Sequence, residues 1–196
     1  MQPIEESFFH MDTLQLAQHL LGQFVVHELP QGTLIGRIVE TEAYLGECDR
    51  AAHSFNNRRT KRTEIMFHEP GHVYSYTMHT HTLINVVSGP VGVPHAVLIR
   101  AVEPVAGLEL MRKNRGSSMK ETHLTNGPGK LTEALQITNE YYGHHWTKKP
   151  LYIARNERVE QIETSPRIGI KNSGEAARYP WRFFEKDNRF VSPYRP

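Results

Sequence analysis

The sequence predicts an α+β fold, namely a single compact domain with a mainly antiparallel, curved β-sheet and flanking helices. The 196 residues are a usual length for one domain, so we expect residues 1–196 to form one unit. Hydrophobic residues make up 38% of the chain, which is enough for a core. Strand-like segments follow one another more often than they alternate with helices, and this order favours an antiparallel sheet over a doubly wound one.

The first half of the chain predicts one helix and then five strands. Asp12 is a good N-cap for a helix that carries apolar residues at helical spacing as far as Leu21, and Gly22 ends the pattern. Runs rich in β-branched and aromatic residues follow this helix. These strand candidates are Phe24–Glu28, Leu34–Tyr44, Val73–Tyr76, Leu83–Val87 and Ala96–Val102.

The second half predicts two helices and three short strands. The helices are Val105–Lys113 and Lys130–Gln136, and the second one follows a break at Gly127-Pro128-Gly129. The polar segment Arg115–Asn126 between them is expected to be a loop. The remaining strand candidates are Leu151–Ala154, Arg167–Ile170 and Trp181–Phe184.

The strand candidate Leu34–Tyr44 carries two carboxylates and an aromatic ring on one face. Side chains alternate along a strand, so Glu40, Glu42 and Tyr44 project to the same side. A carboxylate beside apolar structure suits a general base, and an aromatic ring nearby is a stacking surface. The alternative is an edge strand whose carboxylates lie in solvent and have no function. Spacing alone favours this alternative, because surface carboxylates are common and catalytic ones are few.

Composition argues against secreted and membrane-bound classes. Cys48 is the single cysteine, which rules out an internal disulfide and suits a reducing compartment. No apolar run approaches the roughly 20 residues that span a bilayer. The segment Met1–Glu6 has acidic residues where a signal peptide has basic ones. We therefore expect a cytoplasmic protein with no membrane partner.

The formal net charge of +2 does not by itself identify a nucleic-acid binder, but basic residues cluster near the Glu40–Tyr44 strand and near the C-terminus. Clusters of this kind on loops beside a site suit contact with phosphates, although ordinary surface solubility explains them equally well. The candidates for phosphate contact are Arg58, Arg59, Lys61, Arg62, Arg178 and Arg182.

The sequence does not support a metal or nucleotide cofactor. The segment His68–His72 spells the zinc-protease pattern H-E-x-x-H, but Pro70 and Gly71 break the helix which that pattern requires, so we expect a turn. The pairs His79/His81 and His144/His145 lack the further convergent ligands of a zinc site. The glycine-rich phosphate loops are missing as well. We therefore predict no metal and no cofactor.

A series of short motifs runs in order along most of the chain beyond the first thirty residues. The first is Val39-Glu40-Thr41-Glu42-Ala43-Tyr44 with Ala51-Ala52-His53-Ser54 after it. The later ones are Met66-Phe67, Pro70–Tyr74, Asn85-Val86-Val87, Val97–Pro104, Gly127–Leu131, Arg167–Ile170, Ala177-Arg178 and Pro180–Phe183. Together these motifs resemble the alkyladenine-DNA glycosylase family, which is also called the mammalian-type 3-methyladenine DNA glycosylase family.

The resemblance implies an enzyme of base excision repair that flips a damaged purine out of double-stranded DNA. Glu42 matches the general base that activates a water for attack on C1′, and Arg100 matches the arginine that helps to hold the water and Glu42. Tyr44 and His53 match residues of the base pocket, and Tyr76 is expected to supply another wall. Asn85 matches the residue that crowds the exocyclic amine of normal guanine.

The resemblance also implies the chemistry. Purines methylated at N3 or N7 are cationic, so they leave readily and can stack on aromatic rings by cation–π contact. No lysine is placed as a Schiff-base nucleophile, which implies a monofunctional glycosylase. The expected lesions are 3-methyladenine, 7-methylguanine, hypoxanthine and ethenoadenine. Glu40 is expected to be a supporting residue, and the enzyme is expected to act as a monomer on the DNA of the bacterial nucleoid.

One segment departs from the family pattern. The family has a tyrosine followed by glycine after the Pro70–Tyr74 motif, and this tyrosine wedges into the duplex. The corresponding segment here, Tyr76–Thr82, lacks that tyrosine and is one residue shorter before Asn85. Met78 or His79 is therefore the candidate intercalating residue, since apolar wedges that include methionine unstack bases in other proteins.

Two other functions compete with the glycosylase. The missing wedge tyrosine allows a damage sensor that binds DNA without cutting it. A carbohydrate hydrolase would use Glu40 and Glu42 as acid and base. Glu40 and Glu42 are two positions apart on one face of a strand, so they lie roughly 6.5–7 Å apart along the backbone. The two carboxyl groups of a glycosidase instead flank opposite sides of the glycosidic bond. The hydrolase therefore ranks last.

Overall fold

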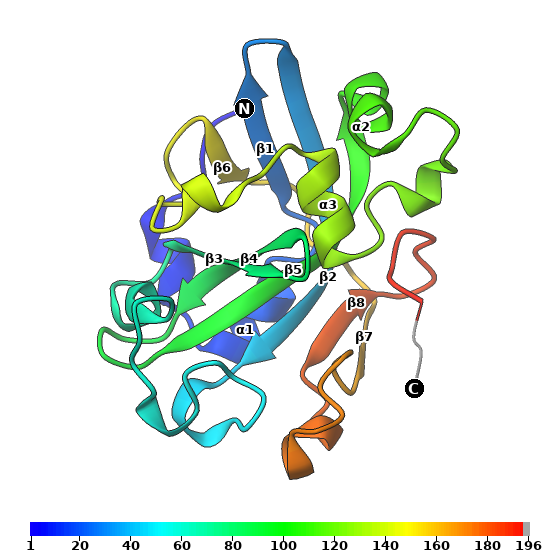
Figure 1. Ribbon diagram of the computed structural model, residues 1–196. Coiled ribbons are helices and arrows are strands. Elements are labelled where there is room, and N and C mark those ends of the chain that lie inside the picture. Colours follow the sequence, from blue (N-terminus) through cyan, green and yellow to red (C-terminus); the bar gives the residue numbers. More distant parts are fainter. Residues whose placement is uncertain (194–196) are drawn as a thin grey trace.

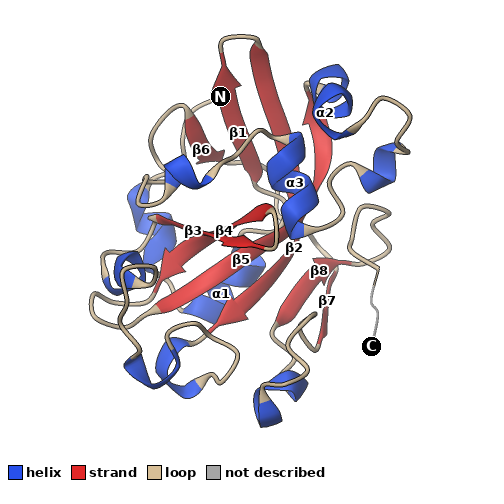
Figure 2. Ribbon diagram, viewed as in Figure 1, coloured by secondary structure: helices blue, strands red, loops and turns tan. Residues whose placement is uncertain are grey.

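The computed structural model describes residues 1–193 and confirms the α+β fold (Figure 1). The strands are β1 (Phe24–Leu29), β2 (Gly32–Tyr44), β3 (Val73–Met78), β4 (His81–Ser88), β5 (His95–Ala106), β6 (Leu151–Ala154), β7 (Ile162–Ser165) and β8 (Arg182–Glu185). The α-helices of these residues are α1 (Thr13–His19), α2 (Leu108–Arg115) and α3 (Pro128–Ala134). Short 3₁₀ turns lie at Glu6–His10, Gly46–Cys48, Phe55–Asn57, Glu64–Phe67, Glu121–His123, Asn139–Tyr141 and Gly174–Arg178. Figure 2 shows that the strands form the centre of the molecule and the helices its periphery.

One curled antiparallel sheet organises the fold, with the strand order β3-β4-β5-β2-β1-β6. β2 pairs with β5 along one edge. Its other edge pairs with β1 over Gly32–Arg37 and then with β8 over Glu40–Glu42. β7 extends the sheet beyond β8. β2 is thus a central strand, so the alternative of an edge strand with solvated carboxylates is wrong.

Three register shifts interrupt the pairing of β2 with β5, and two of them lie beside Glu40. Ile38 lies opposite Val102, Glu40 opposite Ala101, and Thr41 opposite Ile99. Val39 is therefore an extra residue on β2, and Arg100 is an extra residue on β5. Such bulges bend a strand and redirect its side chains, and they are frequent beside active sites.

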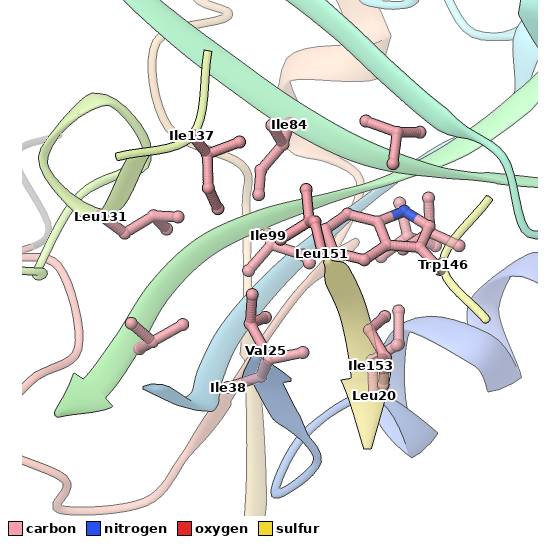
Figure 3. Packing of buried hydrophobic residues seen from close by; sticks show 14 of the residues in the cluster. Leu20, Val25, Ile38, Ile84, Ile99, Leu131, Ile137, Trp146, Leu151 and Ile153 are labelled. Carbon is pink, nitrogen blue, oxygen red and sulfur yellow. The ribbon is translucent and has the colours of Figure 1, made fainter. Parts of the chain in front are cut away.

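Side-chain alternation separates a core face from a second face of the sheet. In β5, Val97 and Ile99 are buried in the main hydrophobic cluster, whereas Leu98 points to the opposite side. The core also takes Ile84 from β4 and the indole of Trp146, as Figure 3 shows. Other members visible there are Leu20, Val25, Ile38, Leu131, Ile137, Leu151 and Ile153.

The predicted first helix is confirmed together with its cap. The Asp12 carboxylate accepts hydrogen bonds from the backbone N–H groups of Leu14 at 2.9 Å and Gln15 at 3.4 Å. α1 packs against β2 and β5, and α3 packs against β4 and β5. Gly22 follows α1 with φ of 87°, and a Cβ there would lie 2.3 Å from the carbonyl oxygen of Glu157. Only glycine fits this turn without rearrangement.

Three predicted elements differ from the structure. β5 runs to Ala106, and α2 begins only after Gly107, whose φ is 79°, so the helix is shorter at its start than Val105–Lys113. α3 begins at Pro128, because backbone N–H groups in the first turn of a helix have no intrahelical acceptor, so a proline there loses no hydrogen bond. It ends at Ala134 rather than Gln136.

The predicted strand Arg167–Ile170 is wrong, and the strand nearby is β7. The Arg167 guanidinium binds buried acceptors, and Gly169 has a φ of 81°, so the chain turns there. β7 is short and mostly polar, with Glu163 and Thr164 both exposed, so it shows no alternating pattern.

The turn expected at His68–His72 is confirmed. A 3₁₀ turn ends at Phe67, Gly71 has a φ of 93°, and His72 already bridges to His145. Within residues 1–193, no helix is long and apolar enough to cross a membrane.

Candidate active site

A cavity of about 510 Å³ opens on the face of the sheet opposite the core. Cross-strand pairing puts Glu42 of β2, Leu98 of β5, Asn85 of β4 and Tyr74 of β3 in one row across this face. All but Glu42 line the cavity directly. A second wall comes from the loop residues 168–173. The volume lies in the range of small-ligand sites.

The Glu42 carboxylate is fully buried and has three donors. One oxygen, Oε2, accepts from the Tyr44 hydroxyl at 2.8 Å and lies 3.3 Å from Nη1 of Arg100. The other oxygen, Oε1, accepts from the backbone N–H of Ile168 at 2.7 Å. Tyr44, Arg100 and Ile168 all line the cavity, so the carboxylate lies directly behind its wall.

The second carboxylate, Glu40, binds two guanidinium groups. Its Oε1 accepts from Nε of Arg100 at 2.9 Å and from Nε of Arg182 at 2.7 Å. Its Oε2 accepts from the backbone N–H of Ser192 at 2.7 Å. Both carboxylates have no exposed surface. Both oxygens of Glu40 thus already accept hydrogen bonds within the protein, which argues against its role as an acid in a carbohydrate hydrolase.

Arg100 is held between the two carboxylates because the β5 bulge aims its side chain at both. Burial opposes the charged guanidinium, but the charges of Glu42 and Glu40 outweigh burial and raise the pKa of Arg100. Two carboxylates and two guanidiniums thus make a buried cluster in which formal charges balance.

The predicted pocket aromatics lie together. The ring centroids of His53 and Tyr76 are 4.6 Å apart, edge to face, and Nδ1 of His53 lies 2.7 Å from the Tyr74 hydroxyl. Burial raises the pKa of Tyr76 to about 12. The Asn85 side-chain amide donates to the Tyr74 carbonyl at 2.9 Å, which fixes its orientation. Tyr44 also lines the cavity, and its hydroxyl donates a hydrogen bond to Glu42.

His53 stays neutral at physiological pH. Burial, aided by the positive charge of Arg62, lowers the pKa of His53 to about 4. The neutral ring has one donor nitrogen and one acceptor nitrogen. It can therefore offer one hydrogen bond to a ligand while it keeps its contact with Tyr74.

The β3–β4 hairpin lies at the mouth of the cavity. Met78 lines the cavity and is 47% exposed. His79 occupies the turn with φ of 54°, and it is exposed as well. Of the two candidate intercalating residues, Met78 is the one that reaches the cavity.

The candidate phosphate contacts divide into exposed and buried residues. Arg58, Lys61, Arg62 and Arg178 are exposed. Arg59 is also exposed, but its guanidinium pairs with Glu64 at 2.6 Å. Arg182 is a correction, because it is 2% exposed and its guanidinium binds Glu40, Ser165 and the Ser192 carbonyl. It cannot reach a phosphate from there.

Sequence reasoning missed the roles of the Arg167–Ile170 motif. The backbone N–H of Ile168 donates a hydrogen bond to Glu42, and almost any residue type could supply such a backbone donor, so the sequence gives no sign of it. Arg167 forms a fully buried pair with Asp49 and stacks on Tyr44. The only signal in the sequence was that this motif belongs to the series shared with the family.

No three histidine, cysteine, aspartate or glutamate side chains of the described chain converge as metal ligands. His79 and His81 are exposed around the hairpin turn, and His144 is bound to backbone carbonyl groups of Lys148 and Leu151. The ionisable side chains in or directly behind the described cavity wall include Glu42, Arg100, His53 and Lys171.

Comparisons with known proteins agree with this geometry. Residues 7–189 match the family model for methylpurine-DNA glycosylase. A relative from Bacillus licheniformis, named "Putative 3-methyladenine DNA glycosylase", is 59% identical over 97% of this chain and 97% of its own. Relatives with the same name from Bacillus subtilis and Listeria monocytogenes are 58% and 45% identical, over 97% and 98% of this chain and 96% and 93% of theirs.

The lowered pKa of His53 predicts a pH-dependent stability. In the unfolded chain His53 binds a proton near pH 6.5, whereas in the folded chain it does so only near pH 4. Because the unfolded state binds more protons between these values, the free energy of unfolding rises with pH across this window. Urea unfolding should show a rise from pH 4 to 6.5 that is smaller in His53→Gln, by on the order of 1 kcal/mol for a partly exposed ring.

A histidine-to-glutamine change at the exposed His123 controls for the loss of one titrating group. Equal slopes in the wild type and in His53→Gln would contradict the assignment of a neutral, partly buried His53.

Proposed function

The chain belongs to the methylpurine-DNA glycosylase family, and we propose that it is a monofunctional DNA glycosylase that excises alkylated and deaminated purines in base excision repair. The observation that carries the proposal is the buried Glu42 carboxylate, 3.3 Å from Arg100 and directly behind the wall of the cavity. The proposed lesions are 3-methyladenine, 7-methylguanine, hypoxanthine and ethenoadenine.

Glu42 is proposed as the general base. It accepts a proton from a water molecule as that water attacks C1′ of the flipped nucleotide, and the C1′–N bond to the purine breaks. Arg100 supplies the positive charge that an ionised carboxylate needs in a buried place. The Ile168 N–H and the Tyr44 hydroxyl fix the carboxylate by further hydrogen bonds, which keeps the base in one orientation for the attack.

The pocket residues are proposed to select the base. A flipped purine would stack on the rings of Tyr44 and Tyr76, and His53 would offer it a hydrogen bond. The Asn85 amide is fixed by the Tyr74 carbonyl and cannot turn away freely. It would therefore crowd the exocyclic amine of guanine and exclude the normal base.

The proposed partner is double-stranded DNA that contains a damaged purine. The exposed residues Arg58, Lys61, Arg62 and Arg178 are proposed to contact its phosphates. Arg59 belongs to the same loop, but its pair with Glu64 competes with a phosphate. We propose a monomer that needs no metal or cofactor and that acts on chromosomal DNA in the cytoplasm.

Met78 is proposed as the residue that enters the duplex when the base leaves. Its apolar side chain is half exposed at the cavity mouth, on the strand that also carries Tyr76. An apolar wedge unstacks neighbouring bases and fills the vacated space. His79 is the alternative, because it stands next to Met78 at the tip of the hairpin.

A damage sensor that flips bases without excising them is the second candidate function. The observation that favours it is the hairpin tip, which carries Met78 and His79 where the family carries a wedge tyrosine. The position of Glu42 argues against it, because a carboxylate directly behind the cavity wall is the group that excision needs as a general base.

Replacement of Glu42 by glutamine should separate the two functions. We expect Glu42→Gln to lower excision of hypoxanthine from a duplex by at least about 10²-fold, the size of a general-base contribution, while the affinity for the duplex falls less than about threefold. The measurements are alkaline cleavage under single-turnover conditions and fluorescence anisotropy. Glu163→Gln, on the exposed β7, is the matched control and should keep the wild-type rate.

Wild-type rates in Glu42→Gln would overturn the mechanism, and no excision by the wild-type protein would favour the sensor. The same assay without alkali tests the monofunctional assignment, because Lys171 lines the cavity. The strand should remain intact until alkali is added.

The wedge proposal predicts a dependence on base pairing. Met78→Ala should slow excision of a hypoxanthine in a stable base pair by about tenfold, since part of the unstacking cost of a few kcal/mol is no longer offset. Excision of the same lesion from single-stranded DNA should change less than twofold. A larger loss in His79→Asn, a change that tolerates the left-handed backbone, would identify His79 as the wedge instead.

A further inference from the structure

A buried guanidinium group lies behind the Tyr44 wall of the cavity. Arg167 and Asp49 have fully buried side chains and form a two-pronged pair, with Nη1 to Oδ2 at 2.5 Å and Nη2 to Oδ1 at 2.8 Å. The carbonyl oxygens of Ala43 and Ala176 accept further hydrogen bonds at 2.8 and 3.3 Å. These bonds lie along the edge of the planar group, so they hold the guanidinium rigidly and leave its faces free to stack.

The rings of Tyr44 and Trp181 stack on this guanidinium. Cζ of Arg167 lies 4.5 Å from the ring centroid of Tyr44 and 5.1 Å from that of Trp181. Arg167 is buried and does not line the cavity, whereas Tyr44 does. A purine in the cavity would therefore stack on Tyr44 from the side away from the guanidinium.

A cation on one face of an aromatic ring weakens the ring's attraction for a second cation. Both cations draw on the same electron-rich π system, and they repel each other across a ring in a buried place where water does not screen them. The Asp49 carboxylate offsets part of this effect, but it meets the Nη atoms at the edge of the group, whereas the guanidinium presents its face to the ring.

The rest of the cavity wall has the same bias. The exposed Arg62 places Cζ 5.8 Å from the ring centroid of Tyr76. Among the described side chains that line the cavity, the formally charged ones are Arg100 and Lys171, and both are positive. The charges of Arg100 and of its buried partners Glu42 and Glu40 largely offset one another, with Arg182 as the second cation, so this cluster adds no net negative charge that would favour a cation. The cavity therefore gives little electrostatic advantage to a cationic base over a neutral one.

We propose that Arg167 is a positioning residue that determines specificity. It fixes the Tyr44 ring and lowers the affinity of that ring for a second cation. The site therefore discriminates less in favour of cationic N-methylpurines and accepts neutral damaged purines. The inference rests on the proposed glycosylase activity and deepens it. It changes the expectation that selectivity depends on cation–π stacking at this ring. Arg167 acts through Tyr44 and touches no reacting atom.

The test compares two lesions in one variant. Single-turnover excision at saturating enzyme is measured on duplexes that carry one 7-methylguanine, which is cationic, or one hypoxanthine, which is neutral, with the spontaneous loss of 7-methylguanine subtracted. The variant is the double change Arg167→Gln with Asp49→Asn, which removes both charges and leaves no unpaired buried ion. We expect the ratio of the 7-methylguanine rate to the hypoxanthine rate to rise about fivefold, which is less than a full desolvated cation–π contact would give, because Asp49 offsets part of the guanidinium charge.

Trp181→Phe is the matched control, because it alters the packing around Arg167 but keeps its charge, and its ratio should stay within twofold of the wild type. Arg62→Met tests the other wall without disturbing the core, since its side chain is exposed, and should raise the ratio about twofold. If the double variant does not fold, an unchanged ratio in Arg62→Met overturns the electrostatic argument on which the inference rests.

The inference is overturned if the folded Arg167→Gln/Asp49→Asn variant loses rate equally on both lesions and keeps the wild-type ratio, because that result indicates a purely structural role. A rise in Trp181→Phe equal to that in the double variant would overturn it too. If the wild type releases neither lesion, the proposed function itself fails, and that result is distinct from an unchanged ratio.

Discussion

The buried carboxylate of Glu40 is the group on which the candidate site depends. It has no exposed surface, and it accepts hydrogen bonds from Arg100, Arg182 and the Ser192 backbone. A charge so deeply buried is tolerated only when it is fully paired, and a partner removed from such a group costs several kcal/mol. Because Nε of Arg100 is bound to Glu40, its Nη1 is left to face Glu42. The geometry of the candidate site therefore follows from the way in which the hydrogen bonds of Glu40 are satisfied.

Several distant segments must meet for this pairing to form. Glu40 comes from β2, Arg100 from the bulge of β5, Arg182 from β8, and Ser192 from the segment that follows β8. The side chain of Phe190 packs on Val39 beside them and seals this segment against the sheet. The site is thus built where the second edge of β2 changes its partner from β1 to β8, so that its rigidity comes from the sheet and its closure from the end of the described chain.

The parts of the fold and site that depend on local sequence could be predicted. The Asp12 cap, the strand β6 and the common face of Glu40, Glu42 and Tyr44 follow from propensity and alternation. The two bulges could not be predicted, because register shifts depend on the partner strand. The burial of Arg182 and the hydrogen bond from the Ile168 N–H to Glu42 depend on tertiary contacts, which no local pattern encodes.

The same distinction explains why the strand predicted at Arg167–Ile170 is wrong. The motif Arg167–Ile170 looks like a strand because it alternates apolar residues, yet its arginine binds Asp49, which lies more than a hundred residues earlier in the chain. A buried polar group takes its partner wherever the fold offers one, and this requirement overrides local propensity. Arg167 and Arg182, whose surroundings were predicted wrongly, are residues that support the wall of the site or bind its carboxylates.

A double-mutant cycle between Glu40 and Arg100 tests the central claim most directly. Single-turnover excision of hypoxanthine is measured for the wild type, Glu40→Gln, Arg100→Gln and the double variant, with folding checked by circular dichroism. If Glu40 acts on catalysis only through Arg100, the double variant should be no more than about twofold slower than Arg100→Gln alone, because coupled residues are not additive. Losses that multiply in the double variant would contradict the account.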